Sequence, residues 1–460
     1  MTKPICLKNE EMEINKENIW EGDLFSRNKV AEDFTKIITS IEQPFVLSIN
    51  SSYGSGKTFF LKRWAEELKQ KGETVVFFNA WDCDFVEKPL LPFLYNFIEQ
   101  LKEQNLVKYD LITDIKNCGD ILFTCFKHFI FEGSNGILDI DELKQKTDAN
   151  SMSLPKVENL YEYNQLRNIL AEFKKDIDKL VKTLSGKNIY IFVDELERCR
   201  PIFAIELLEA IKHLFNVKGL VFILGIDRSQ LKHTISNIYG CGMDGEGYLR
   251  RFIDLELELP KPDIQKYTEN LQNIFDIHNK DNSVVGRWTT GYDEFNTYFN
   301  LFASIYPMQL RDIEQIYAKF NVITKMLDEK VNKIMPILAL LMILKIKDIK
   351  LYNQFTIKSL SIENFENFIG VNIYSKFNNL DENQQYELDK FLQICRAISN
   401  NNYYEIVQKI QKQYESPETV PIEVRAKISG YNNVIEIQRA LRAYNRDLIQ
   451  YLKNMIGYIR

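Results

Sequence analysis

The sequence has few of the residues that bind metals or form cross-links. Its 460 residues include four histidines and seven cysteines, and the cysteines are scattered without a C-x-x-C pair. The N-terminal residues also lack the apolar core of a signal peptide. We therefore expect reduced thiols, a cytoplasmic protein and no structural zinc site.

Long apolar runs and an excess of basic residues are also missing. The most apolar stretch, residues 334–344, lies between two lysines and is much shorter than the roughly 20 residues that a membrane helix needs. We predict a buried helix there and no membrane span. The formal net charge of -6 does not point to nucleic acid, so any such binding would be local.

What the sequence does contain is a stretch, SSYGSGKT at residues 51–58, that ends like a phosphate-binding loop. The pattern predicts a buried strand at Phe45 to Ile49 before it and a helix after it, the context in which loop N–H groups hold phosphates. Ser51 replaces the usual first glycine, but Gly54 and Gly56 keep the curvature. The alternative is an ordinary Gly-Ser turn before a helix. The predicted nucleotide-binding residues are Ser52, Tyr53, Gly54, Ser55, Gly56, Lys57 and Thr58, with Lys57 on the β- and γ-phosphates and Thr58 also on magnesium.

A second motif supplies the acidic groups that such a loop needs. Residues 189–193 form an apolar, strand-like run that ends in Asp194 and Glu195. ATP hydrolysis on a P-loop uses one carboxylate on magnesium and usually another that activates water. We assign Asp194 to the metal and Glu195 to general-base catalysis; the alternative is that the pair only caps a following helix.

Five stretches in order resemble the KAP family of P-loop NTPases, which is related to the AAA+ and STAND ATPases. They are YGSGKT, FFNAW, VDELERCRP, VFILGIDRSQL and YLRRFIDLELELP, and together they cover roughly residues 17–320. The chain departs from the family pattern at Ser51 and Tyr53, and it has Glu195 and Glu197 where the acidic box has aspartates. Residues 351–460 contain no family motif.

The resemblance implies an α/β P-loop NTPase core with a mostly parallel sheet in three α/β/α layers. We expect this core at residues 17–262 with a helical insert at about 105–160, a helical lid at 263–350 and a helical C-terminal domain at 351–460. Many family members carry membrane helices in the insert. Here Lys127 and His128 interrupt an already short apolar run, so we expect a soluble member.

Further site residues follow from the same resemblance. Asp227 and Arg228 come after an apolar strand, and they look like a sensor pair if that strand lies beside the acidic one; the alternative is a surface ion pair. Arg250 or Arg251 is a candidate arginine finger for a neighbouring subunit, and Arg311 resembles a lid arginine that folds over the nucleotide. A structural or solvated arginine is the alternative for each.

Three weaker assignments concern flanking residues. Asn79 is a candidate contact to nucleotide or water, while Trp81 is expected to pack in the core. Asp23 and Arg27 precede the first strand, where related ATPases hold the base.

The last predicted helix has a basic face. Its members lie at helical spacing and could meet RNA, DNA or an acidic partner, although a solvated face is the favoured interpretation. They are Arg439, Arg442, Arg446 and Lys453.

These features predict an enzyme that binds ATP and Mg²⁺ and hydrolyses ATP as an assembly switch. The resemblance implies a homo-oligomer that acts with a separate effector, as in bacterial anti-phage defence. The alternative is a nucleotide-bound scaffold with little hydrolysis that binds a partner protein or nucleic acid. A small-molecule kinase fits poorly, because Arg250 to Pro260 and the helical lid resemble assembly ATPases.

Overall fold

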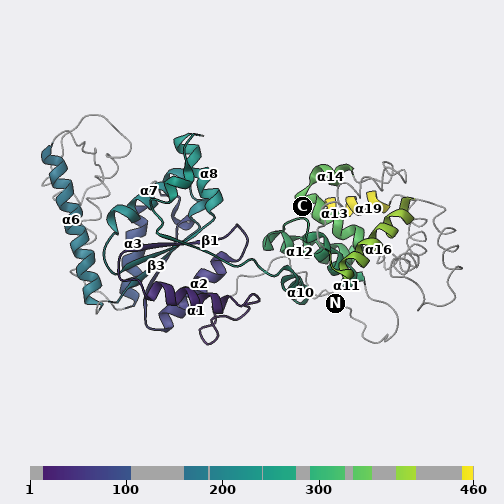
Figure 1. Ribbon diagram of the computed structural model, residues 1–460, viewed down its shortest axis with the longest axis horizontal. Coiled ribbons are helices and arrows are strands. Elements are labelled where there is room, and N and C mark those ends of the chain that lie inside the picture. Colours follow the sequence, from purple (N-terminus) through teal and green to yellow (C-terminus); the bar gives the residue numbers. More distant parts are fainter. Residues whose placement is uncertain are drawn as a thin grey trace. The chain divides into compact units, whose positions relative to one another are not determined.

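The computed structural model describes nine stretches of the chain. They are residues 14–86, 88–104, 160–184, 187–240, 242–275, 291–326, 335–354, 380–399 and 448–458. The chain divides into two compact units at Lys261 and Pro262 (Figure 1), and each unit is considered by itself. The predicted insert at about 105–160 lies, except for Leu160, outside the described residues.

A parallel five-stranded sheet forms the centre of the first unit, Glu13–Lys261 (Figure 1). The strand order is β2-β3-β4-β1-β5, and all four pairings are parallel. The strands are β1 (Phe45–Asn50), β2 (Thr74–Asn79), β3 (Ile189–Asp194), β4 (Leu220–Ile226) and β5 (Leu255–Glu258). Strands β3 and β4 are buried along their whole length, because central strands of a parallel sheet are covered on both faces.

Helices cover both faces of this sheet, so the predicted three-layer α/β/α core is confirmed. On one face, Phe60 and Trp64 pack against Tyr190 and Phe192 of β3. On the other face, aromatic side chains from three helices meet Phe222 of β4 and its neighbours. The first layer contains α1 (Arg27–Thr39) and α2 (Lys57–Gln70), and the second contains α3 (Leu90–Glu103), α6 (Leu160–Thr183), α7 (Pro201–Leu214), α8 (Arg228–Tyr239) and α9 (Gly245–Leu249).

The described part of the second unit is helical. Its helices are α10 (Ile264–Ile274), α11 (Gly291–Ala303), α12 (Leu310–Met326), α13 (Met335–Lys347), α14 (Ile349–Gln354), α16 (Glu382–Ser399) and α19 (Leu448–Tyr458). Every residue from Met335 to Leu344 is buried in α13, which confirms the buried helix predicted for the most apolar run. Across the described residues, no helix combines the length and the apolar character needed to cross a membrane.

Strand register brings the polar ends of four strands to one edge of the sheet. Asn79 pairs with Asp194, Asp194 with Gly225, and Asn50 with Ile226. Strand β4 therefore lies beside the acidic strand, which is the condition on which the sensor interpretation of Asp227 and Arg228 depends. Gly225 allows the close approach: a Cβ there would come within 2.2 Å of Leu61 Cδ1 and 2.9 Å of Asp194 Oδ1.

Gly225→Ala should therefore destabilise the first unit and displace Asp194. We expect a loss of about 1 to 3 kcal/mol in the free energy of unfolding, because the added methyl group overpacks a filled site. Urea denaturation followed by circular dichroism measures it. Gly242→Ala is the control, since a Cβ there meets nothing within 4 Å; equal effects of the two substitutions would contradict the packing argument.

Candidate functional site

A tight loop joins β1 to α2 at the polar edge of the sheet. Gly54 has a φ of 72° and Gly56 a φ of 86°, and glycine adopts this left-handed region without the clash of a Cβ. The loop ends at Lys57, the first residue of α2. Its curvature is that of the phosphate-binding loop expected from the sequence.

Ser51 fits the loop without the conformational freedom of glycine. It is not among the described non-glycine residues with positive φ. Its backbone N–H donates to the Ile226 carbonyl at 3.1 Å, and its hydroxyl forms a 2.6 Å hydrogen bond with the Ser55 hydroxyl. The substitution for glycine therefore adds a cross-link inside the loop.

Two charged residues brace the same loop. Asp227 Oδ2 accepts a hydrogen bond from the Tyr53 backbone N–H at 3.0 Å, and Asp227 Oδ1 caps α8. Arg27 is 2% exposed, and its guanidinium donates to the Ser55 carbonyl at 3.3 Å. Burial lowers the pKa of Arg27 to about 10. Arg27 therefore contacts the loop backbone from the protein interior, and the sensor role of Asp227 stays a prediction.

The neighbours of these two residues have local roles. Asp23 accepts hydrogen bonds from the backbone N–H groups of Phe25 and Asn28, and so shapes the turn before α1. Arg228 forms ion pairs with Glu246 and Glu256. These ion pairs link α8 to α9 and β5, and the Arg228 side chain that forms them is 13% exposed, so they are not the surface ion pair of the alternative.

Asp194 and Thr58, the predicted magnesium residues, lie together. Asp194 is 1% exposed, Thr58 hydrogen-bonds to its carboxylate, and the Glu195 N–H donates to its Oδ1 at 2.9 Å. Burial raises the pKa of Asp194 to about 6, although the Thr58 hydrogen bond and the Lys57 charge lower it. Asp194 Oδ2 is buried without a hydrogen-bond partner. An unused carboxylate oxygen beside a hydroxyl is a donor set that fits Mg²⁺.

Glu195, the predicted general base, is held in an unusual backbone conformation. Its φ of 62° lies in a region that costs a non-glycine residue about 1 to 2 kcal/mol, and such residues gather at functional sites. Its Oε1 is 2.9 Å from Arg198 Nη1, and Asn79 Nδ2 donates to its Oε2 at 3.4 Å. The Glu195 side chain makes no capping hydrogen bond to the turn η2 (Leu196–Arg198), so helix capping does not explain it.

Lys57 has a partner that the sequence did not identify. Its Nζ is 2.6 Å from Glu197 Oε1, and the two side chains are only 8% and 6% exposed. Glu197 Oε2 is buried without a hydrogen-bond partner. The acidic box of the sequence contains Glu197, but only the fold shows that η2 returns this side chain to the loop lysine.

Arg198 connects the loop to the surface. Its guanidinium lies 4.9 Å from the Tyr53 ring centroid and 5.3 Å from that of Trp81. The expectation that Trp81 packs in the core is wrong, because the residue is 51% exposed. Trp81 begins the turn η1 (Trp81–Cys83) just beyond β2, where its ring meets Arg198 instead of the core.

A comparison with protein families agrees with this geometry. Residues 27–327 match the KAP family P-loop domain. The chain belongs to this family. No curated protein matches the chain.

Among solved structures, this KAP protein is similar to two nucleotide complexes. The Aeropyrum pernix ORC2 protein, in its ADPNP–ADP complexes, is 11% identical with a TM-score of 0.28, covering 93% of this chain and 89% of that one. AMPPCP-bound DnaA from Aquifex aeolicus is 14% identical with a TM-score of 0.29, covering 98% and 99%. The family assignment rests on the domain match.

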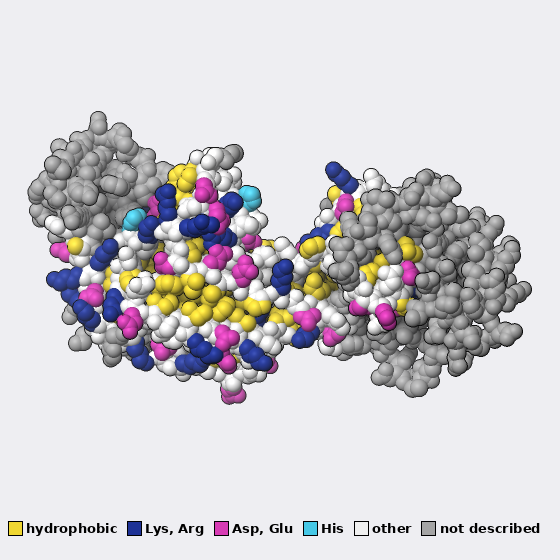
Figure 2. Space-filling model, viewed as in Figure 1, with side chains coloured by type: hydrophobic (Ala, Val, Ile, Leu, Met, Phe, Trp, Pro, Cys, Tyr) yellow, Lys and Arg dark blue, Asp and Glu magenta, His cyan; other side chains and the backbone are white. Residues whose placement is uncertain are grey.

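The predicted arginines of the KAP protein are exposed residues, two in the first unit and one in the second. Arg250 and Arg251 follow α9 and are exposed, and the Arg251 guanidinium lies 5.8 Å from the Tyr248 ring centroid. Arg311 is exposed in the first turn of α12, which belongs to the second unit. Charges of both signs are mixed on the face of the described residues seen in Figure 2.

Of the four basic residues predicted to share a face of the last helix, the structure describes only Lys453. Arg439, Arg442 and Arg446 lie outside the described residues. Lys453, in α19, lies 4.7 Å from the Tyr352 ring centroid, and burial lowers its pKa. Lys453 thus packs partly against its own unit.

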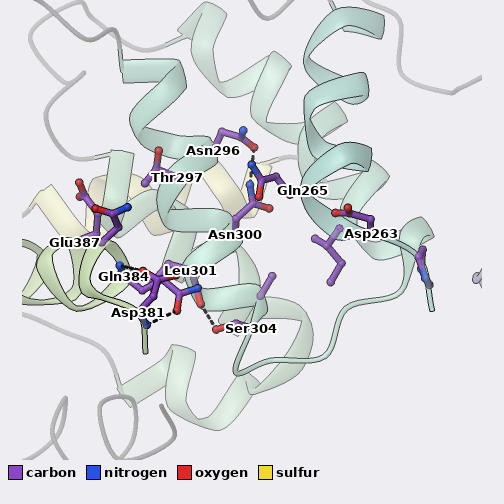
Figure 3. A pocket seen from close by; sticks show the side chains of 14 residues that line it. Asp263, Gln265, Asn296, Thr297, Asn300, Leu301, Ser304, Asp381, Gln384 and Glu387 are labelled. Carbon is purple, nitrogen blue, oxygen red and sulfur yellow. Dashed lines mark hydrogen bonds between the residues drawn. The ribbon is translucent and has the colours of Figure 1, made fainter. Parts of the chain in front are cut away.

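A separate polar cavity of about 660 Å³ lies in the second unit, among α10, α11 and α16 (Figure 3). Asp263 caps α10, and the Asp381 carboxylate accepts a hydrogen bond from the Gln384 backbone N–H at the start of α16. Asn300 bonds to Thr268 of α10. These lining groups cap their own helices or link neighbouring helices, and the described lining contains no nucleophile hydrogen-bonded to a general base.

Asp194→Asn should stabilise the nucleotide-free protein above pH 6. The folded pKa of about 6 exceeds the ordinary 3.8, so ionisation favours the unfolded chain, and the penalty is complete above pH 6 and fades as the pH falls towards 3.8. We expect a gain on the order of 1 to 3 kcal/mol in the free energy of unfolding at pH 8, and a smaller gain at pH 5.

Urea denaturation at the two pH values measures this difference. Asp33→Asn is the control, because the Asp33 side chain is 72% exposed and should change stability little at either pH. A gain at pH 8 no larger than that of the control would contradict the buried-charge explanation.

Proposed function

We propose that this KAP protein is an ATP-hydrolysing switch. The observation that supports it is the meeting of Lys57, Thr58, Asp194 and Glu195 at the carboxyl edge of one parallel sheet. Each residue matches a requirement of phosphoryl transfer to water: a cation for the phosphates, oxygen ligands for the metal and a base for the nucleophile.

Each residue of the proposed site has a role that follows from its position. Loop N–H groups and Lys57 bind the phosphates, while Thr58 and Asp194 hold Mg²⁺, which when bound neutralises charge on the phosphate oxygens. Glu195 follows Asp194 directly, and its carboxylate is the group that accepts the proton of the attacking water. Asp227 transmits changes at the loop to α8, because it contacts the Tyr53 N–H and the α8 N-terminus together.

Assembly forms the second part of the proposal. Because Arg250 and Arg251 are exposed, a neighbouring copy of the chain can receive either guanidinium at its nucleotide, which makes the protein a homo-oligomer whose hydrolysis depends on contact. Arg311 closes over the nucleotide from the helical lid. A separate effector, anti-phage defence and a cytoplasmic location are proposed from the family resemblance and the scattered cysteines.

A nucleotide-bound scaffold is the second candidate, and one observation favours it. Both carboxylate oxygens of Glu195 are engaged, by Arg198 and by Asn79, so the base is not free in this arrangement. A protein that stayed in this state would bind nucleotide with little hydrolysis and would act by binding a partner protein or nucleic acid.

Glu195→Gln separates the two candidates. A carboxamide cannot accept the proton, so phosphate release from ATP with Mg²⁺ should fall by roughly 10² to 10⁴ while ATP affinity stays near that of the wild type. Steady-state phosphate release and isothermal titration with ATP measure the two quantities.

Glu32→Gln, on the exposed side of α1, is the matched control for loss of one carboxylate. It should leave both quantities unchanged. If the wild type binds ATP and does not hydrolyse it at any protein concentration, the autonomous ATPase is rejected in favour of the scaffold.

Mixing two inactive variants tests the contribution in trans. Arg250→Ala or Arg251→Ala removes the finger but keeps a complete nucleotide site, whereas Glu195→Gln keeps the finger. Equimolar mixtures should therefore recover phosphate release, up to about a quarter of the wild-type rate if subunits pair at random. Absence of recovery with both arginine variants, although the mixed oligomers form, would contradict a finger supplied in trans.

A further inference from the structure

The turn η2 carries two oppositely charged side chains, and each contacts a different residue of the proposed site. Glu197 reaches the phosphate-binding lysine, and its neighbour Arg198 reaches the general base Glu195. The same three-residue turn therefore contacts both Lys57, which should bind the phosphates, and Glu195, which should activate water.

The contact with Lys57 competes directly with a nucleotide. The Lys57 Nζ to Glu197 Oε1 distance of 2.6 Å is a direct ion pair, and both side chains are almost fully buried. The second oxygen of Glu197 has no hydrogen-bond partner, so Lys57 is the group that stabilises this buried carboxylate. Phosphates brought to Lys57 would add negative charge beside Glu197, Asp194 and Glu195, and like charges in a buried setting repel strongly.

The contacts around Arg198 link the same turn to the loop. Its guanidinium lies near the rings of Tyr53, on the loop, and Trp81, beyond β2. Leu196 is fully buried and can serve as the fixed point of the turn. The left-handed backbone of Glu195 is kept only while such contacts outweigh its cost.

We propose that the Lys57–Glu197 ion pair is a latch that the nucleotide must open, and that its opening frees Oε1 of Glu195 from Arg198 for catalysis, while Oε2 keeps the longer hydrogen bond from Asn79. Phosphate binding displaces Glu197 from Lys57; η2 then turns about Leu196 and moves Arg198 away from the Glu195 carboxylate. The inference rests on the proposed function, because it describes the regulation of the same site. It makes nucleotide binding the event that releases the general base.

Glu197→Gln should open the latch without nucleotide. A site that is competent for only about a tenth of the time binds its ligand roughly tenfold more weakly than an open one, so ADP affinity should rise about tenfold in the variant. Glu197→Asp keeps the charge on a shorter side chain and should give an intermediate affinity. Isothermal titration with ADP, with and without Mg²⁺, measures all three proteins, and Glu32→Gln should match the wild type.

Trp81 emission provides a second readout of the same event. The chain has four tryptophans, and the difference between each protein and its Trp81→Phe counterpart isolates this one. In the wild type, ADP should change the Trp81 emission as Arg198 moves. Nucleotide-free Glu197→Gln should already show the ADP-bound emission of the wild type.

The outcomes distinguish the latch from the function on which it rests. Unchanged or weaker ADP affinity in folded Glu197→Gln and Glu197→Asp overturns the latch while leaving a nucleotide-binding protein. Tighter affinity without the Trp81 change overturns the link to Glu195. If the folded wild type and all variants fail to bind ADP or ATP, the proposed function fails and the latch with it.

Discussion

Lys57 carries its positive charge where less than a tenth of its side chain meets water. A buried charge needs a partner of opposite sign, because removal from water costs several kcal/mol per ion. Glu197 supplies that partner in the structure, and phosphates would supply it in a nucleotide complex. The same constraint reaches Asp194, whose pKa is raised by burial even though Lys57 is near. The state of the site therefore depends on whether Glu197 or a phosphate forms the ion pair with Lys57.

The parallel sheet makes this concentration of charge feasible. The carboxyl ends of parallel strands lie at the same edge of a sheet. The side chains that follow β1, β3 and β4 are therefore brought together at that edge by the strand order alone. Gly225 lets Asp194 and α2 approach closely, and Arg27 with Asp227 fixes the loop backbone through its carbonyl and N–H groups.

Sequence patterns could predict those strands and helices that are determined by residues close together in the chain. The strand, loop and helix around Lys57, the apolar strand before Asp194 and the buried helix α13 are local patterns, and the strands and helix were predicted correctly. The sequence did not predict the surroundings of Trp81 and Arg198 or the ion-pair partner of Lys57. These contacts depend on turns that bring separate segments of the chain together. The aromatic character of Trp81 predicted burial, whereas its place just beyond a strand end exposes it.

The two glutamates of the acidic box both depend on side-chain length for their contacts. The acidic box has glutamates at positions 195 and 197, and these are the two carboxylates that contact Arg198 and Lys57. An aspartate is shorter by one carbon–carbon bond, about 1.5 Å, so at position 197 it could not keep a 2.6 Å contact unless η2 moved closer to the loop. In this chain, the length of the Glu197 side chain is therefore what brings its carboxylate to Lys57.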